Sequence, residues 1–149
     1  MSLSLIELVR TDFRTAKPAD ELNSRFQRLL GLPHRYGPAR LAIGRSLGVA
    51  HAPKLEMSFT GYGKPIKGEN LFGTGSDLAC WITLLVQHAA PEQLDRARLQ
   101  HLVAAHWSRG IYLLWDDWKA SLSDFDSFVA RQAERATIPK GNVRASAGR

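Results

Sequence analysis

The chain has 149 residues, of which 44% are hydrophobic and 23% are charged, a composition typical of one globular domain with its own core. No window approaches the ~20 apolar residues of a membrane helix, and the N-terminus lacks the basic and apolar segments of a secretory signal. The single cysteine, Cys80, excludes an internal disulfide and a two-cysteine metal or redox motif. We therefore expect a cytoplasmic protein without a cofactor.

The net charge of +6 is distributed unevenly. Residues 1–76 hold 11 Lys or Arg against 6 Asp or Glu, residues 77–130 hold 4 against 7, and residues 131–149 hold 5 against 1. An excess of basic charge at both ends is typical of a protein that binds a polyanion, most commonly nucleic acid. A basic face that only keeps the protein in solution explains the charge equally well.

The first part of the chain predicts a short strand followed by two helices. The apolar run Leu3–Val9 fits a strand or a frayed helix, and we favour the strand. Pro18 is suited to the first turn of a helix over residues 18–30, in which apolar residues recur at helical spacing, and Gly31 ends that helix. Proline and glycine bound a second helix over residues 38–47 in the same way.

Seven basic residues around these helices form our candidate DNA-binding set. They are Arg25, Arg28, Arg35, Arg40, Arg45, Lys64 and Lys67. Arg35 lies at the start of the second helix, where unpaired backbone amides already favour an anion such as phosphate. Arg40 and Arg45 lie on the polar side of that helix. The set predicts contacts to phosphates, which depend strongly on salt and little on base sequence.

Residues 52–76 are rich in glycine and proline and predict an irregular loop or hairpin insertion. The stretch Gly68–Gly75 superficially resembles a phosphate-binding loop. It lacks the Gly-Lys-[Ser/Thr] that such a loop requires, so we do not expect a nucleoside triphosphate site there.

The second half of the chain predicts three further helices. The helix over residues 77–89 is apolar almost all round, which predicts burial, with Cys80 as a small core residue. The helix over residues 91–116 carries His106 inside its apolar stripe, as expected of a core histidine with a hydrogen bond. A last amphipathic helix spans residues 123–136 and packs through Phe125, Phe128 and Val129.

Together these elements predict a mainly α fold, a compact helical domain over residues 1–137 with a short N-terminal strand and a flexible basic tail over residues 138–149. Asp116, Asp117 and His106 are the candidates for a nicking enzyme. No nucleophile or base stands at a defined spacing from them, so we read the aspartates as a solvated helix end and expect no catalysis.

Three segments carry a resemblance to a known family. They are GLPHRYGPARLAIGRSL (31–47), GKPIKGENLFG (63–73) and LVAAHWSRGIYLL (102–114). In order and separation they resemble the signature regions of the DndE family, the small subunit of the bacterial DNA phosphorothioation system. Ala39-Arg40, His106-Trp107 and Gly110 carry the match, together with the glycine-to-glycine loop.

The resemblance implies a mostly helical fold with a ribbon-helix-helix-like N-terminal part. It also implies self-assembly and binding of double-stranded DNA, nicked DNA in particular, through basic residues. Such a subunit works beside an ATPase-like and a sulfurtransferase-like subunit that replace a phosphate oxygen by sulfur. We therefore expect a non-catalytic DNA-binding subunit of a sulfur-modification complex.

Two further expectations concern protein surfaces. The alternative function is a protein–protein adaptor, with Leu41 and the pair Trp115 and Trp118 as docking anchors. A homo-oligomer, dimer or tetramer, is expected because Leu41 lies on the outward side of its helix beside Gly44, and because a strand over residues 3–9 leaves an edge to pair.

Overall fold

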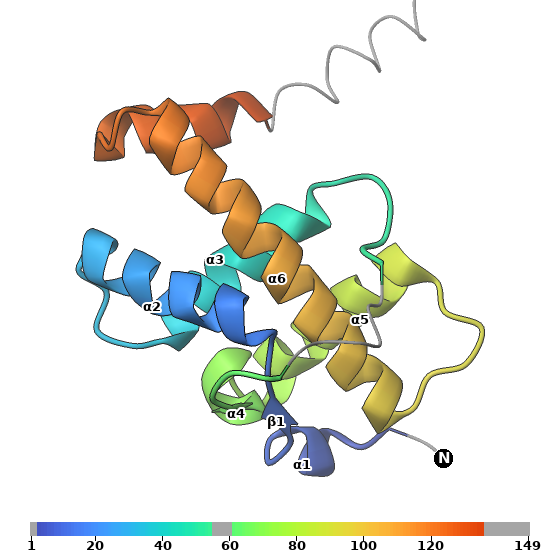
Figure 1. Cartoon of the computed structure of the whole chain (residues 1–149). Helices are drawn as coiled ribbons and strands as arrows, with labels where there is room; N and C mark the ends of the chain where they lie inside the picture. Colours follow the sequence, from blue (N-terminus) through green and yellow to red (C-terminus); the bar gives the residue numbers. More distant parts are fainter. Residues whose placement is uncertain (1–2, 55–60, 136–149) are drawn as a thin grey trace, which may run out of the picture. The chain divides into compact units, whose positions relative to one another are not determined.

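The computed structural model describes residues 3–54 and 61–135. The chain divides into two compact units, Met1–Leu113 and Leu114–Arg149. The described residues are mainly helical, with one two-stranded antiparallel sheet, which confirms the predicted fold class (Figure 1). None of the helices within the described ranges is both long and apolar enough to cross a membrane.

The predicted strand over residues 3–9 is wrong in its position. Leu5–Leu8 form a single helical turn, α1, in which only Leu8 is buried. The run is not a strand because its apolar residues do not alternate with polar ones as a half-buried strand requires. The first strand, β1, is Asp12–Phe13 and pairs with β2, Ile66–Lys67. Phe13 is fully buried, so this pair is anchored in the core of the first unit.

The two helices that follow are confirmed. Helix α2 spans Lys17–Leu30 and ends at Gly31, whose φ of 67° is the left-handed conformation that glycine favours. Helix α3 spans Tyr36–Leu47 and starts two residues earlier than predicted. The earlier start is possible because Pro38 still lies in the first turn, where a helix does not need its amide hydrogen.

The glycine-rich segment is irregular, as predicted, and it returns to the N-terminal part of the chain. From residue 61 onward it contains β2 and the short helix α4, Gly68–Leu71. A Cβ on Gly68 would lie 1.9 Å from the carbonyl oxygen of Leu8, so only glycine allows this close approach of α4 to α1. The remainder of this prediction, residues 55–60, falls outside the described residues.

Helix α5, Gly75–Ala89, begins close to its predicted start, but it is not buried all round. Leu78, Ile82 and Leu85 form its single buried face. Cys80 lies away from that face and is exposed, so its prediction as a core residue is wrong. One-sided burial follows from the i, i+4, i+7 spacing of the buried residues, which gives one stripe along the helix.

Helix α6 spans Arg96–Ala120, later at both ends than predicted. It begins late because Ala90 ends α5 with a left-handed φ of 45°, and residues 91–95 are non-helical, with a bend at residues 92–93. Within the first unit, α6 crosses α3 closely, since a Cβ on Gly110 would lie 1.6 Å from the carbonyl oxygen of Ala42 (Figure 1). Trp107, three residues before Gly110 on α6, is fully buried.

The second unit contains the end of α6 and a helix over residues 125–135. Trp118 is buried and packs edge-on against Phe128 at 5.6 Å, so it is not the exposed docking anchor that we predicted. Of the predicted packing residues of the last helix, Phe128 is buried, whereas Phe125 and Val129 are exposed.

The aspartates of the second unit differ from each other. Asp117 is buried and ion-paired with Arg135, and it also accepts a hydrogen bond from Gln132 Nε2 at 2.9 Å. The prediction of a solvated helix end is therefore wrong for Asp117. Asp116 is exposed, as predicted, and pairs with Lys119 at 3.4 Å. The predicted tail, residues 138–149, lies outside the described residues.

Candidate nucleic-acid interface

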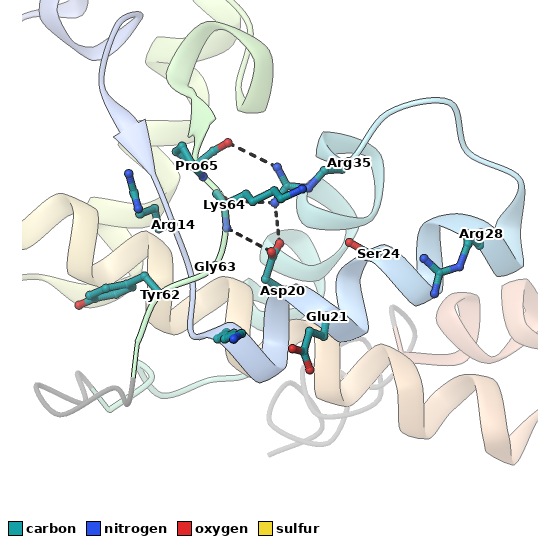
Figure 2. Close-up of a pocket in the computed structure, with 11 residues that line it drawn as sticks. Arg14, Asp20, Glu21, Ser24, Arg28, Arg35, Tyr62, Gly63, Lys64 and Pro65 are labelled. Atoms are coloured by element: carbon teal, nitrogen blue, oxygen red, sulfur yellow. Dashed lines mark hydrogen bonds and ion pairs between the residues drawn. The ribbon is translucent and has the colours of Figure 1, made fainter.

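The start of α2 is held against residues 63–65 by a carboxylate–guanidinium pair. Arg35 Nη2 donates to Asp20 Oδ1 at 2.6 Å, and the backbone amide of Lys64 donates to Asp20 Oδ2 at 3.2 Å. The same guanidinium also donates to the carbonyl oxygens of Lys64, at 3.1 Å, and Pro65, at 3.4 Å (Figure 2). We call this group, Asp20, Arg35 and residues 63–65, the clasp.

Gly63 is required by the geometry of the clasp. A Cβ at this position would lie 2.3 Å from Asp20 Cβ, a distance that real Cβ atoms essentially never show. Asp20 is itself almost completely buried, so its side chain has little room to move away. The backbone of residues 63–65 therefore approaches α2 only because position 63 has no side chain.

A pocket of about 620 Å³ surrounds the clasp. It is lined by Arg14, Lys17, Asp20, Glu21, Ser24, Arg28, Arg35, Tyr62, Gly63, Lys64 and Pro65. In Figure 2, Arg14 and Tyr62 lie at one end, Arg28 lies at the other, and the clasp lies between them. Five basic side chains thus face two acidic ones, and one of the acids is already paired with Arg35.

Four of the five basic side chains make no side-chain hydrogen bond or ion pair with any other described residue. They are Arg14, Lys17, Arg28 and Lys64. We call these four the open cations. A concave surface lined by positively charged side chains focuses the electrostatic potential and attracts anions.

The structure separates the seven predicted binding residues into different roles. Arg28, Arg35 and Lys64 line the pocket. Arg40 instead donates to the carbonyl oxygens of Leu71, at 2.5 Å, and Asn70, at 2.8 Å, and its guanidinium lies 4.5 Å from the centre of the Tyr36 ring. Arg40 therefore holds α4 against α3.

The other three predicted residues do not line the pocket within the described part of the chain. Lys67 pairs with Asp12 across the two strands at 2.9 Å. Arg25 is exposed on α2, and Arg45 is half-buried on α3.

Arg14, Lys17 and Tyr62 were not predicted, because their position depends on pairing between distant segments. Ala16 and Tyr62 form an isolated antiparallel bridge, and the amide of Lys17 donates to the carbonyl oxygen of Gly61 at 3.2 Å. The amide of Gly63 donates to the carbonyl oxygen of Thr15 at 2.9 Å. The β1–α2 linker and the glycine-rich segment thus form one wall of the pocket. No pattern in the local sequence predicts this contact.

His106 is a core histidine, as predicted. Its ring is completely buried, and its Nδ1 lies 2.8 Å from Ser46 Oγ, which also accepts a hydrogen bond from Arg109 Nε at 2.8 Å. The Ser46 hydroxyl therefore donates to Nδ1 of a neutral imidazole. Burial, followed by the nearby His88 and Arg109, lowers the pKa of His106 to about 3.

Among residues 3–54 and 61–135, no group of three or more His, Cys, Asp and Glu side chains is arranged to hold a metal ion. The chain matches no known protein-family model, and no curated protein matches it.

Proposed function

We propose that this protein binds duplex DNA through its phosphates at the pocket around the clasp. The observation that carries the proposal is the set of open cations, which surround one concave surface without partners among the described residues. Lysine and arginine side chains that neutralise phosphates supply most of the sequence-independent affinity of DNA-binding proteins.

Two of the predicted arginines, Arg35 in the clasp and Arg40 on α3, have a supporting role in this proposal. Arg35 positions the backbone that carries Lys64, and Arg40 positions α4 through the carbonyl oxygens of Asn70 and Leu71. Replacing Arg35 and Arg40 together by alanine then weakens DNA binding largely because residues 63–71 lose their position.

For the wider role, we propose a non-catalytic subunit of a cytoplasmic DNA sulfur-modification complex, acting on intact or nicked duplex DNA beside an ATPase-like and a sulfurtransferase-like subunit. The resemblance of residues 31–47, 63–73 and 102–114 to the DndE family supports this role. Arg35 and residues 63–65 of the clasp fall within these segments, as does the crossing at Gly110, whereas Asp20 lies outside them.

The test is a salt series with fluorescently labelled duplexes of random sequence. Fluorescence anisotropy is measured between about 50 and 200 mM salt, where affinities that depend on phosphate contacts fall steeply. Lys17→Gln with Arg28→Gln removes two open cations. The matched control, Arg96→Gln with Arg98→Gln, removes the same charge from exposed positions at the start of α6.

We expect the pocket variant to bind more weakly than the control and to lose about two units of the salt slope, one for each phosphate contact removed. Equal affinity of the two variants would place the DNA contact elsewhere. Absence of salt-dependent binding in the wild type would overturn the proposal and favour the adaptor function.

A further inference from the structure

A second pocket, of about 380 Å³, lies next to the first and shares two of its residues. Its lining consists of Asp12, Arg14, Tyr62, Gln100, His101 and Ala104. Arg14 and Tyr62 also line the pocket around the clasp, so these two side chains form the wall common to both. We call the pocket around the clasp the phosphate pocket and the second one the side pocket.

The side pocket is built from hydrogen-bonded elements of the first unit. Gln100 Nε2, on α6, donates to the carbonyl oxygen of Asp12 at 2.8 Å. Thr15 Oγ1 donates to the carbonyl oxygen of Ala104 at 2.9 Å, and this bond is buried. Helix α6 is thereby fixed to the strand and linker that carry Arg14, which gives the side pocket a preformed shape.

The two pockets differ in chemistry. The phosphate pocket is dominated by basic side chains, whereas the side pocket has one, Arg14. Gln100 Oε1 and the His101 imidazole offer the side pocket hydrogen-bonding groups, and Asp12 contributes a carboxylate that pairs with Lys67 at 2.9 Å. Tyr62 is 45% exposed, so the wall common to both pockets carries an aromatic residue with accessible surface, the kind of residue on which bases stack.

We propose that the two pockets together bind one nucleotide unit, with its phosphate among the open cations and its base in the side pocket against Tyr62. The inference deepens the proposed function and rests on it for the phosphate contact. A nucleotide joins its phosphate and base through one sugar, which suits two pockets that share a wall. The side-pocket volume lies within the range of small-ligand sites.

The nucleotide has two possible sources, an unpaired nucleotide of DNA or a free mononucleotide. A base that is paired and stacked inside a duplex does not reach into a pocket, whereas an unpaired base leaves the stack at low cost in free energy. The inference therefore predicts that DNA with an unpaired nucleotide binds more tightly than fully paired DNA.

The experiment compares three labelled duplexes of the same flanking sequence: fully paired, with one unpaired thymidine, and with one unpaired abasic residue. The variants are Tyr62→Ala, which removes the ring, and Tyr62→Phe, which keeps it. Tyr112→Ala is the matched control, because Tyr112 is 46% exposed, lies on α6 and lines neither pocket. A competition with free thymidine monophosphate identifies the source.

We expect the wild type to prefer the unpaired thymidine over the abasic residue by about ten-fold, within the range measured for stacking one base on an aromatic ring. Tyr62→Phe and Tyr112→Ala retain this preference and Tyr62→Ala loses it. A second outcome also supports the site: the three duplexes bind equally, but thymidine monophosphate binds with the same dependence on Tyr62. The ligand of the site is then the free nucleotide.

The inference is overturned if neither the unpaired thymidine nor the free nucleotide binds in a way that depends on the Tyr62 ring. Salt-dependent binding of the fully paired duplex in that case leaves the proposed function standing. If the paired duplex also fails to bind, both fall, so the two failures are distinguishable.

Discussion

At the scale of single residues, His106 links the stability of the first unit to pH. Its pKa is about 3 in the folded protein, against 6.5 for an ordinary histidine. The unfolded chain therefore takes up a proton first as the pH falls. The contribution of His106 is fully present above pH 6.5 and is lost progressively towards pH 3, by up to about 1.4 kcal/mol for each pH unit.

Urea unfolding at several pH values between 7.5 and 4.5 measures this effect. We expect the free energy of unfolding of the wild type to fall more steeply below pH 6.5 than that of His106→Gln. His51→Gln is the control, because His51 is exposed, and it should keep the wild-type slope. A His106→Gln slope equal to that of the wild type would contradict the assignment.

Gly63→Ala tests the clasp. The added Cβ meets Asp20 Cβ at 2.3 Å and Asp20 Oδ2 at 2.6 Å, so residues 63–65 or the carboxylate must shift. We expect a loss of about 1–3 kcal/mol of stability, together with weaker DNA binding because Lys64 is displaced. Gly44→Ala is the control, because the nearest atom to its added Cβ is 4.0 Å away. It should leave stability, measured by thermal melts, and DNA binding, measured by anisotropy, unchanged or slightly improved.

At the scale of elements, the close crossing of α3 and α6 depends on Gly110. In Gly110→Ala, the Cβ meets backbone atoms of Ala42, which do not move aside as a flexible side chain does. We expect a loss of at least about 3 kcal/mol in urea unfolding, above the usual range for overpacking. Ser108→Ala on the same helix should change stability by less than about 1 kcal/mol; a similar loss in both variants would remove the crossing as the cause.

The helices were largely predictable because their signals are local. Pro18 and Gly31 bound α2, and the apolar spacing of α5 gave its position. The strand was misplaced because a run such as Leu3–Val9 has no periodicity that separates a strand from a helical turn. The partner of β1 lies more than fifty residues along the chain, and that pairing leaves no trace in the sequence around Asp12.

The candidate site was predictable only in part, for the same reason. Counting basic residues near α2 and α3 found Arg28, Arg35 and Lys64, which line the phosphate pocket. It missed Arg14 and Lys17, whose position follows from the contact of the β1–α2 linker with residues 61–63. It also gave Arg40 a place at the surface, although backbone carbonyl oxygens accept the hydrogen bonds that its Nε and Nη2 donate.

At the scale of the whole molecule, self-assembly remains a prediction, but one of its two structural reasons no longer applies. The expected open strand edge over residues 3–9 does not exist, since that region is helical and β1 pairs with β2 of the same chain. Leu41 is 46% exposed on α3, near Gly44, and remains the candidate contact.

We expect light scattering to give a mass that is a multiple of 16.6 kDa, and Leu41→Glu to reduce it to the single-chain value. A wild-type mass of 16.6 kDa would contradict self-assembly of the isolated chain.

The hydrogen bonds from Thr15 to Ala104 and from Gln100 to Asp12 also bear on synthesis at the ribosome. They join positions 89 and 88 residues apart, so the scaffold behind the two pockets is incomplete until most of the chain has been made. A nascent chain that ends before residue 96 already carries every residue that lines the phosphate pocket but lacks α6. Contacts between such distant positions form late in folding. The strand and linker around Arg14 therefore gain their fixed position against α6 only when most of the chain has been translated.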